Sequence, residues 1–424
     1  MNDSQNPQPL EVVNTTMADT NRVDHDSKAH SIAHQPCDVE VKNYNVAGFP
    51  CLYKYVSPKS LLPPTSAAAK PLIVFIPGGA HLARIAYGVP PFQASDFLAY
   101  HLSALGYSFL GISYPIESTD TEGDPLRDEE QDTSILMPPA YPAFSIADWG
   151  RQTAEITARV VSEKSLQGEV ALVVWSMGGR MVVPYMKHAT ALGLRINFLF
   201  ALAASPGLLD SNPPMKNAQC SEKGYAKCGD KFEKWFLDQI RRQQEQFEGG
   251  REVLSYKAWR EDYFGHTPVS LMGWKLRSVW SEETGYAFTE DVWRGTIDSG
   301  ATDFASLPNW IATLYPSSMM DPKHALLDQA NWGYLMTHKL TSRVTETMAK
   351  AATLGGEEDN WWQRVMGFVH SVPARLSCQM PGNHFFFLGH TGARRTAMEI
   401  DRLLNVTNGL ETELQRMLEE INQL

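Results

Sequence analysis

A serine at position 176 stands where a strand is expected to turn sharply into a helix. Four apolar residues, 171–174, precede Trp175 and Ser176 and predict a short buried strand. Two glycines, Gly178 and Gly179, come next and allow the backbone to reverse into the next helical run. A serine in such a corner exposes its hydroxyl, and the start of the helix offers N–H groups and a positive dipole end to a developing oxyanion. The stretch therefore indicates a nucleophilic serine.

Residues 174–178 resemble the Gly-x-Ser-x-Gly elbow of the α/β-hydrolase superfamily. Val174 is the departure, because the family usually has glycine there, where the returning helix leaves little room for a Cβ. The resemblance implies a mostly parallel sheet with helices on both faces and a triad of serine, acid and histidine. The chain is also loosely similar, over residues 38–407, to fungal proteins of this fold in natural-product pathways, which implies an acyl substrate from secondary metabolism.

A second corner comes after the apolar run 71–76, which is typical of a buried parallel strand. Gly78 and Gly79 stand where the resembled family has the glycines that complete its oxyanion hole. Glycine suits this place because the main chain approaches the substrate oxygen with no Cβ in between. We expect the N–H of Gly79 or Ala80 to act together with that of Met177. Alternatively, the two glycines form only a turn that ends the strand.

Two aspartates are candidates for the acid that the resemblance implies. Asp321 comes after the apolar run 310–315, and the resembled fold places its acid just past a late strand. Asp210 comes after the preceding predicted strand, 196–203, where some members of the superfamily carry the acid. Asp321 is the preferred candidate. Either aspartate could instead cap the next helix.

The candidate general base is His384, which lies after the last predicted strand, 374–378, in a segment that resembles the Gly-x-His-Phe of many α/β-hydrolases, thioesterases included. This histidine would take the proton of Ser176 and return it to the leaving group. A single histidine is more often structural, and His390 lies close by in the sequence. The order Ser176, Asp321, His384, each after its own strand, favours His384.

Composition excludes several classes of partner. The net charge is −11 and the pI is near 5.6, so no basic excess exists to bind nucleic acid. No stretch approaches 18 continuous apolar residues, so we expect no membrane span. The N-terminus lacks the charged-then-apolar pattern of a secretion signal.

The cysteines point to a reducing compartment. There are five, an odd number, and they are scattered along the chain. Cys220 and Cys228 are close enough to pair or to hold a metal, but no second pair of ligands follows them. We therefore expect free thiols, a cytoplasmic protein, and neither a metal nor another cofactor.

The order of predicted elements is that of an α/β protein, with strands and helices alternating around a parallel sheet. Residues 1–36 are polar and predicted to be disordered, since they cannot bury enough apolar surface. The core is expected at 37–209 and 307–424, with a helical lid inserted at 210–306. Further helical segments, 325–354 and 360–370, predict a second insertion between the acid and the base.

The lid is rich in tryptophan and tyrosine, which predicts a roomy apolar pocket rather than a sugar or phosphate site. Trp175 beside the nucleophile, and Trp259 and Trp274 in the lid, are the candidates for substrate contact. For each tryptophan the alternative is plain core packing.

These features together predict a serine-dependent hydrolase or acyltransferase that acts on a small, apolar ester or thioester through an acyl-Ser176 intermediate. Two alternatives stay open. The same residues could serve a lyase, cyclase or isomerase without a covalent intermediate, or Val174 could mark a binding protein with an inactive triad.

The C-terminal segment carries an apolar stripe at alternating spacings of four and three, formed by Leu410, Leu414, Met417, Ile421 and Leu424. A helix of two heptads is marginal in water and must lie against something. Packing against the protein's own fold, in a monomer, is preferred over pairing with a second subunit.

Overall fold

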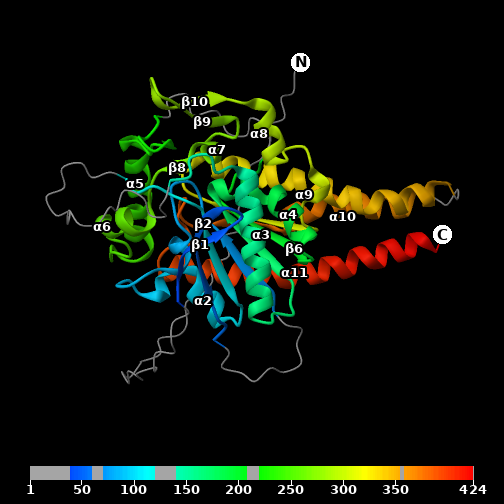
Figure 1. Ribbon diagram of the computed structural model, residues 1–424. Coiled ribbons are helices and arrows are strands. Elements are labelled where there is room, and N and C mark those ends of the chain that lie inside the picture. Colours follow the sequence, from blue (N-terminus) through cyan, green and yellow to red (C-terminus); the bar gives the residue numbers. More distant parts are fainter. Residues whose placement is uncertain (1–38, 60–69, 120–139, 208–218, 354–357, 424) are drawn as a thin grey trace, which may run out of the picture. The chain divides into compact units, whose positions relative to one another are not determined.

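The computed structural model describes residues 39–59, 70–119, 140–207, 219–353 and 358–423 (Figure 1). These residues belong to one compact unit, Asp38–Leu424. The predicted disorder of residues 1–36 and the alternative acid Asp210 lie outside the described residues.

The unit is built on an eight-stranded sheet with the order β1-β2-β4-β3-β5-β6-β11-β12. Only β2 runs antiparallel to its neighbours, β1 and β4, and the remaining pairings are parallel. The strands are β1 (Val41–Val46), β2 (Phe49–Val56), β3 (Leu72–Ile76), β4 (Phe109–Ser113), β5 (Val170–Trp175), β6 (Ile196–Leu202), β11 (Trp310–Pro316) and β12 (Ser377–Met380).

The central strands β3, β4 and β5 are buried along their whole length. Continuous apolar runs of this kind form where helices cover both faces of a parallel sheet. Right-handed crossovers place α2 on one face and α3 and α4 on the other, because β4 and β6 lie on opposite sides of the β3–β5 pair. The helices are α1 (Arg84–Tyr87), α2 (Leu98–Ala104), α3 (Ile146–Glu163) and α4 (Val182–Ala191), with short 3-10 turns η1 (Ala94–Asp96) and η2 (Ser176–Met181).

The predicted lid is not wholly helical, so that prediction was wrong in part. Its described part, 219–306, contains two small sheets beside its helices. The larger is the hairpin of β9 and β10, where Trp280 and Tyr286 pair across the strands with ring centroids 4.9 Å apart. The elements are β7 (Tyr225–Ala226), α5 (Asp230–Phe247), α6 (Tyr256–Ala258), η3 (Trp259–Tyr263), β8 (Thr267–Pro268), α7 (Val269–Met272), β9 (Leu276–Ser281), β10 (Gly285–Glu290), α8 (Val292–Ser299) and η4 (Phe304–Ser306).

The second insertion is helical, as predicted, and consists of α9 (Pro322–Thr353) and α10 (Glu358–Arg375). The C-terminal helix α11 (His390–Asn422) lies alongside both in Figure 1. The apolar stripe of α11 is buried in the main core from Leu410 to Ile421. Its acidic side chains pair with the insertion, since Glu411 accepts from Arg343 at 2.6 Å and Glu413 from Arg375 at 3.0 Å. The stripe therefore packs within the chain. A monomer in solution stays a prediction.

Among the described helices, none is both long and apolar enough to cross a membrane.

The packing of α11 predicts a stability effect. Leu414 is fully buried, so Leu414→Ala should lower the free energy of unfolding by about 2–5 kcal/mol. Urea unfolding monitored by circular dichroism measures this. Glu419→Ala, at an exposed position of the same helix, is the matched control and should change stability by less than about 0.5 kcal/mol. Equal stability of the two variants, or a switch from dimer to monomer in Leu414→Ala, would contradict packing within the chain.

Candidate active site

Ser176 occupies a strained corner between β5 and η2. Its φ is +53°, a region that side chains other than glycine rarely adopt, and such strain collects at functional sites. The corner fits tightly, because a Cβ at Gly179 would lie 2.3 Å from the carbonyl oxygen of Ser205. Val174 is fully buried in β5, and the chain continues beyond Ser176 as a 3-10 turn before α4 begins. Valine at position 174 is thus compatible with the corner that the sequence predicts.

The acid and base candidates meet directly. Nδ1 of His384 donates to Oδ2 of Asp321 at 2.7 Å, and the two side chains are almost completely buried. Asp321 stands between β11 and α9, and His384 stands between β12 and α11. Because β11 and β12 are parallel neighbours, their carboxyl ends bring the two residues to the same edge of the sheet.

Asp321 also begins α9, because its carboxylate accepts from the backbone N–H of His324. The helix-capping role and the acid role, which the sequence left as alternatives, are thus combined in one side chain. Burial raises the pKa of Asp321, but the charge and hydrogen bond of His384 and the bond from His324 outweigh burial and lower it overall. Asp321 is therefore a carboxylate at neutral pH.

His384 is held as a neutral imidazole. Burial lowers its pKa, as do the neighbouring His324 and Lys323 side chains, while Asp321 acts in the opposite direction without prevailing. Since Nδ1–H donates to Asp321, Nε2 is left as the acceptor. A neutral histidine with its acceptor nitrogen available is the form that a general base requires.

Trp175 links the base to the nucleophile. Its indole N–H donates to the backbone carbonyl of His384 at 3.1 Å, and the two ring centroids lie 5.1 Å apart. Within the described residues, no hydrogen bond joins the Ser176 hydroxyl to His384. Such bonds are often loose in enzymes without substrate and tighten only in the complex.

The second glycine corner, Gly78 to Ala80, lies against the nucleophile. A Cβ at Gly78 would stand 2.6 Å from the Cβ and 3.2 Å from the hydroxyl oxygen of Ser176. Only glycine permits this approach. The corner is more than a strand-ending turn, since it faces the serine as an oxyanion-binding loop must.

Three side chains fix the peptide planes of this corner. Tyr114 donates its hydroxyl to the Gly78 carbonyl at 2.9 Å, and His81 donates Nδ1–H to the Gly79 carbonyl at 2.8 Å. The N–H of Ala80 donates to the hydroxyl of Thr267 at 2.9 Å. Ala80 is therefore not available as an oxyanion donor, which corrects one of the two predictions for this corner.

Gly79 is the remaining candidate for an oxyanion donor at this corner. In a trans peptide the C=O and N–H point in opposite directions, so a Gly78 carbonyl held by Tyr114 turns the Gly79 N–H away from that hydroxyl. This N–H has no acceptor in the described part of the chain. The N–H of Met177 lies in the first turn of η2, where helical N–H groups have no partner within the helix.

The tautomer of His81 is set by its two bonds. The indole N–H of Trp259 donates to Nε2 of His81 at 3.1 Å, so Nδ1 carries the proton that goes to Gly79. Burial lowers the pKa of His81 to about 3, which keeps the ring neutral. The ring is enclosed by aromatic side chains, among them Trp175 and Phe236.

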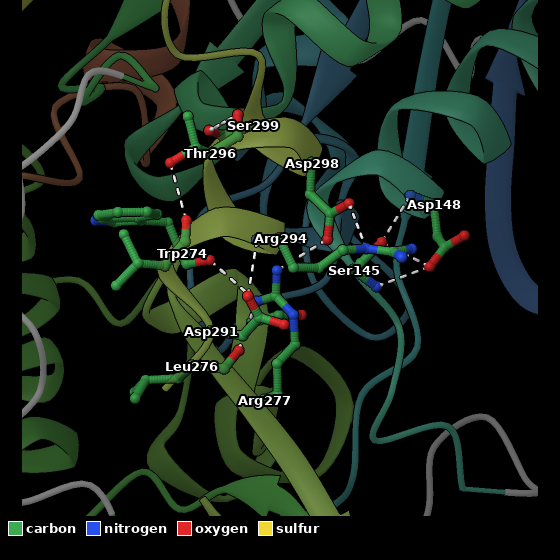
Figure 2. Close-up of polar contacts among 12 residues, drawn as sticks. Ser145, Asp148, Trp274, Leu276, Arg277, Asp291, Arg294, Thr296, Asp298 and Ser299 are labelled. Atoms are coloured by element: carbon green, nitrogen blue, oxygen red, sulfur yellow. Dashed lines mark hydrogen bonds and ion pairs between the residues drawn. The ribbon is translucent and has the colours of Figure 1, made fainter. Parts of the chain in front are cut away.

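Two of the predicted substrate contacts are placed elsewhere. Trp259 has no exposed surface and stacks on Phe264, so it supports the corner through His81 and lines no open pocket. Trp274 packs against α8 at Gly295, and its carbonyl accepts from Arg277 in a network centred on Asp298 (Figure 2). Trp175 is fully buried beneath His384. The side chain that does lie over Gly79 is Met272, together with the slightly more distant Met177.

Several residues at the site have little signal in the sequence. Met272 and Thr267 belong to the lid, and Tyr114 directly follows β4. No sequence motif surrounds any of them. Trp235 also lies against His384, with ring centroids 5.4 Å apart. Its place in the amphipathic helix α5 was the one available signal.

One cluster has the side chains of a metal site. Asp321, His324 and His384 each place one potential ligand atom within 4.8 Å of the others. However, Asp321 and His384 bond directly to each other, and His324 Nδ1 is shared by both carboxylate oxygens of Asp328 at 3.0 Å. These bonds account for the cluster without an ion. Cys220 and Cys228 are free thiols.

The strand order now decides the fold. The sheet has its second strand antiparallel to its neighbours, and β3 and β4 exchange places in the order. Ser176 follows β5, and Asp321 and His384 follow the last two strands. This is the strand order and the placing of residues that define the α/β-hydrolase fold. The chain has the α/β-hydrolase fold. The fold class predicted from the sequence is thereby confirmed.

No family model matches the chain, and no curated protein matches it. Among solved structures, a bacterial heroin esterase is similar at 13% identity, with a TM-score of 0.34 and 71% of each chain covered. A probable hydrolytic enzyme from Pseudomonas aeruginosa is 11% identical, with a TM-score of 0.36 over 87% of this chain and 93% of that one. MenH from S. aureus is 11% identical, with a TM-score of 0.34 over 86% and 98%. The fold assignment rests on the strand order, not on these similarities.

Proposed function

We propose that this protein is a serine hydrolase or acyltransferase that acts on an ester or thioester. The observation that carries the proposal is the position of Ser176 at a strained corner, beside a neutral His384 that is bonded to a buried Asp321. A binding protein would have no need for a strained serine, a locked imidazole tautomer and a glycine loop that faces the serine hydroxyl, all at one edge of the sheet.

The mechanism uses each of these groups. Nε2 of His384 accepts the hydroxyl proton as the oxygen of Ser176 attacks the carbonyl carbon, and Asp321 stabilises the imidazolium that forms. The N–H groups of Gly79 and Met177 donate to the oxyanion. His384 then protonates the leaving alcohol or thiol, and the acyl group remains on Ser176. Water or a second acceptor, deprotonated by His384, releases it.

The surroundings favour an apolar segment in the substrate. Met272 and Met177 lie over Gly79, and Trp235 and Phe236 lie against His384. Methionine adapts to irregular apolar groups, and the aromatic rings exclude water from the reacting carbonyl. We place the substrate among acyl esters or thioesters of secondary metabolism, in keeping with the resemblance in the sequence.

A fluorophosphonate probe tests the nucleophile. The probe should label the wild-type chain at one site, and Ser176→Ala should abolish both labelling and turnover, which intact-mass spectrometry and an ester assay measure. Ser205→Ala is the matched control, because Ser205 lies beside the corner but carries no positioned base, and it should still be labelled. Labelling that survives Ser176→Ala would remove Ser176 as the nucleophile. Turnover that survives it would favour a lyase, cyclase or isomerase without a covalent intermediate.

The charge state of His384 predicts the pH profile. The base must be neutral, so kcat/KM should rise with pH through the pKa of His384, and this acid limb should lie below the ordinary histidine value of 6.5. Asp321→Asn should lower kcat by roughly three to four orders of magnitude, because the base loses its tautomer and charge partner. It should also move the limb to lower pH, since the group that raises the pKa is gone.

Asp230→Asn, an exposed change at the start of α5, is the control for the pH profile and should alter neither quantity. An acid limb at or above pH 6.5, or an Asp321→Asn variant with nearly full activity, would contradict the assignment of acid and base.

The peptide plane held by Tyr114 predicts a selective effect on kcat. Tyr114→Phe removes the bond to the Gly78 carbonyl and loosens the Gly79 N–H, so kcat should fall by roughly tenfold or more with KM nearly unchanged. Steady-state kinetics on one ester measures both. Tyr185→Phe is the control, because that hydroxyl is also buried but makes no hydrogen bond to the glycine corner among the described residues, so its loss should not affect kcat. A parallel loss in both variants would mean that Tyr114 serves only packing.

A further inference from the structure

Arg180 stands four residues after the nucleophile, within the same 3-10 turn. Its Nη1 donates to the backbone carbonyls of Leu271 and Met272 at 2.5 and 2.8 Å. Both carbonyls end α7, and Met272 is the residue whose side chain covers Gly79. Arg180 therefore lies between the nucleophile corner and the lid.

The charge of Arg180 is not balanced by a carboxylate. Its two acceptors are neutral carbonyls, and in the portion of the chain that the structure describes no acidic side chain forms an ion pair with it. Burial lowers the pKa of Arg180 to about 10, so the guanidinium stays protonated at neutral pH. Arg180 is half-buried, and a partly desolvated guanidinium without a carboxylate partner, so close to Ser176, is a candidate for binding an anionic ligand.

Arg84 is a buried arginine whose charge is paired with carboxylates. It forms two hydrogen bonds with Glu40, at 2.9 and 2.7 Å, and a third with the carboxylate of Asp262 at 3.3 Å. Accordingly the pKa of Arg84 is raised, whereas that of Arg180 is lowered. Arg84 is buried with two carboxylate partners, whereas the half-buried Arg180 has none among the described residues.

The unused edge of Arg180 is the one that binds carboxylates. Both hydrogen bonds use Nη1, so the Nε and Nη2 groups have no protein acceptor among the described residues. These two N–H groups lie parallel and pair side-on with the two oxygens of a carboxylate. Lysine or a backbone N–H cannot reproduce that geometry.

A hollow adjoins Arg180. It is partly open to solvent, and its other walls are largely apolar, among them Gly179, Val183, Phe304 and Trp332. Arg180 is the one charged residue among those that line it. A ligand that reaches Arg180 from this side meets mainly apolar neighbours.

Lys323 adds a second positive charge nearby. It lies in the first turn of α9, close enough to Arg180 that burial and the arginine together lower its pKa to about 8. Asp328 and Asp321 act in the opposite direction. Asp321 is bonded to His384 and Asp328 to His324, and neither acid forms an ion pair with Arg180.

We propose that Arg180 binds a carboxylate carried by the acyl group of the substrate. The inference rests on the proposed function and narrows it to half-esters or half-thioesters of dicarboxylic acids. Four residues of a 3-10 turn span roughly 8 Å along its axis, which a short carbon chain covers between the reacting carbonyl and the carboxylate. The acyl part is chosen because an interior group stays bound in the acyl-enzyme, while the leaving group must depart.

Paired substrates test the proposal. The probes are the 4-nitrophenyl half-ester of glutaric acid and its neutral methyl ester, which differ only in the charge. The wild-type chain should prefer the charged ester in kcat/KM. Arg180→Gln should lower the ratio of kcat/KM for the charged ester to kcat/KM for the neutral ester by roughly 10- to 100-fold, as expected for lost hydrogen bonds to a charged group. A loss that the two esters share measures the bonds from Arg180 to Leu271 and Met272. Arg180→Lys, which keeps the charge but not the fork, should fall in between.

Arg195→Gln, an exposed arginine that precedes β6, is the matched control and should leave the preference unchanged. Should Arg180→Gln not fold, Arg180→Lys and the wild-type preference still decide the question. A wild-type chain with no preference for the charged ester, or a folded Arg180→Gln that keeps the full preference, would overturn the proposal.

Binding without turnover separates this proposal from the proposed function. Calorimetric titration of Ser176→Ala with glutarate should show binding that Arg180→Gln in the same background removes. Inorganic phosphate is the second probe, and tighter binding of phosphate than of glutarate would overturn the carboxylate assignment. Arg180-dependent binding of glutarate in a chain that hydrolyses neither ester would sustain the anion site and refute the hydrolase. Hydrolysis of both esters without such binding would sustain the hydrolase and refute the anion site.

Discussion

The structure of the site depends on how closely three corners meet at the carboxyl edge of the sheet. Ser176 leaves β5 with a positive φ, and its carbonyl accepts from the N–H of Ser205, which lies just after β6. On the other side the backbone of Gly78, after β3, approaches the serine too closely for any Cβ. Neighbouring parallel strands hold these corners at fixed distances. A nucleophile, its oxyanion donors and its base can then share a few ångströms because no side chain separates the backbones.

The lid takes part in the site as well as covering it. Thr267 accepts from Ala80, Trp259 sets the tautomer of His81, and Met272 lies over Gly79. Two isolated bridges, from His81 to Phe264 and from Glu117 to His266, fasten the same segment to the core. The orientation of the peptide planes from Gly78 to Ala80 is therefore a joint property of the core and of residues 259–272.

Local patterns predicted the site residues that stand at the ends of strands. Ser176, Asp321 and His384 each come just after an apolar run, and the parallel sheet brings such positions to one edge, so their order in the sequence was enough to predict where they lie. Their catalytic roles stay a prediction. Ala80 and Trp259 were placed wrongly because their partners are 187 and 178 residues away. No local pattern carries that information. The short strands β7 and β8 of the lid were missed for a related reason, since they have two residues each and pair with each other across a long stretch of sequence.

The long helical insertion between Asp321 and His384 helps to hold these two side chains together. Asp321 directly precedes α9, and His384 lies shortly before α11, so each of the two side chains is close to the start of a long helix. These helices pack against each other further along, where Arg343 of α9 and Trp310 both donate to Glu411 of α11. Because a helix is stiff over such lengths, contact between α9 and α11 limits how far their first turns can separate. The hydrogen bond between Asp321 and His384 is then constrained by the sheet on one side and by the helix pair on the other.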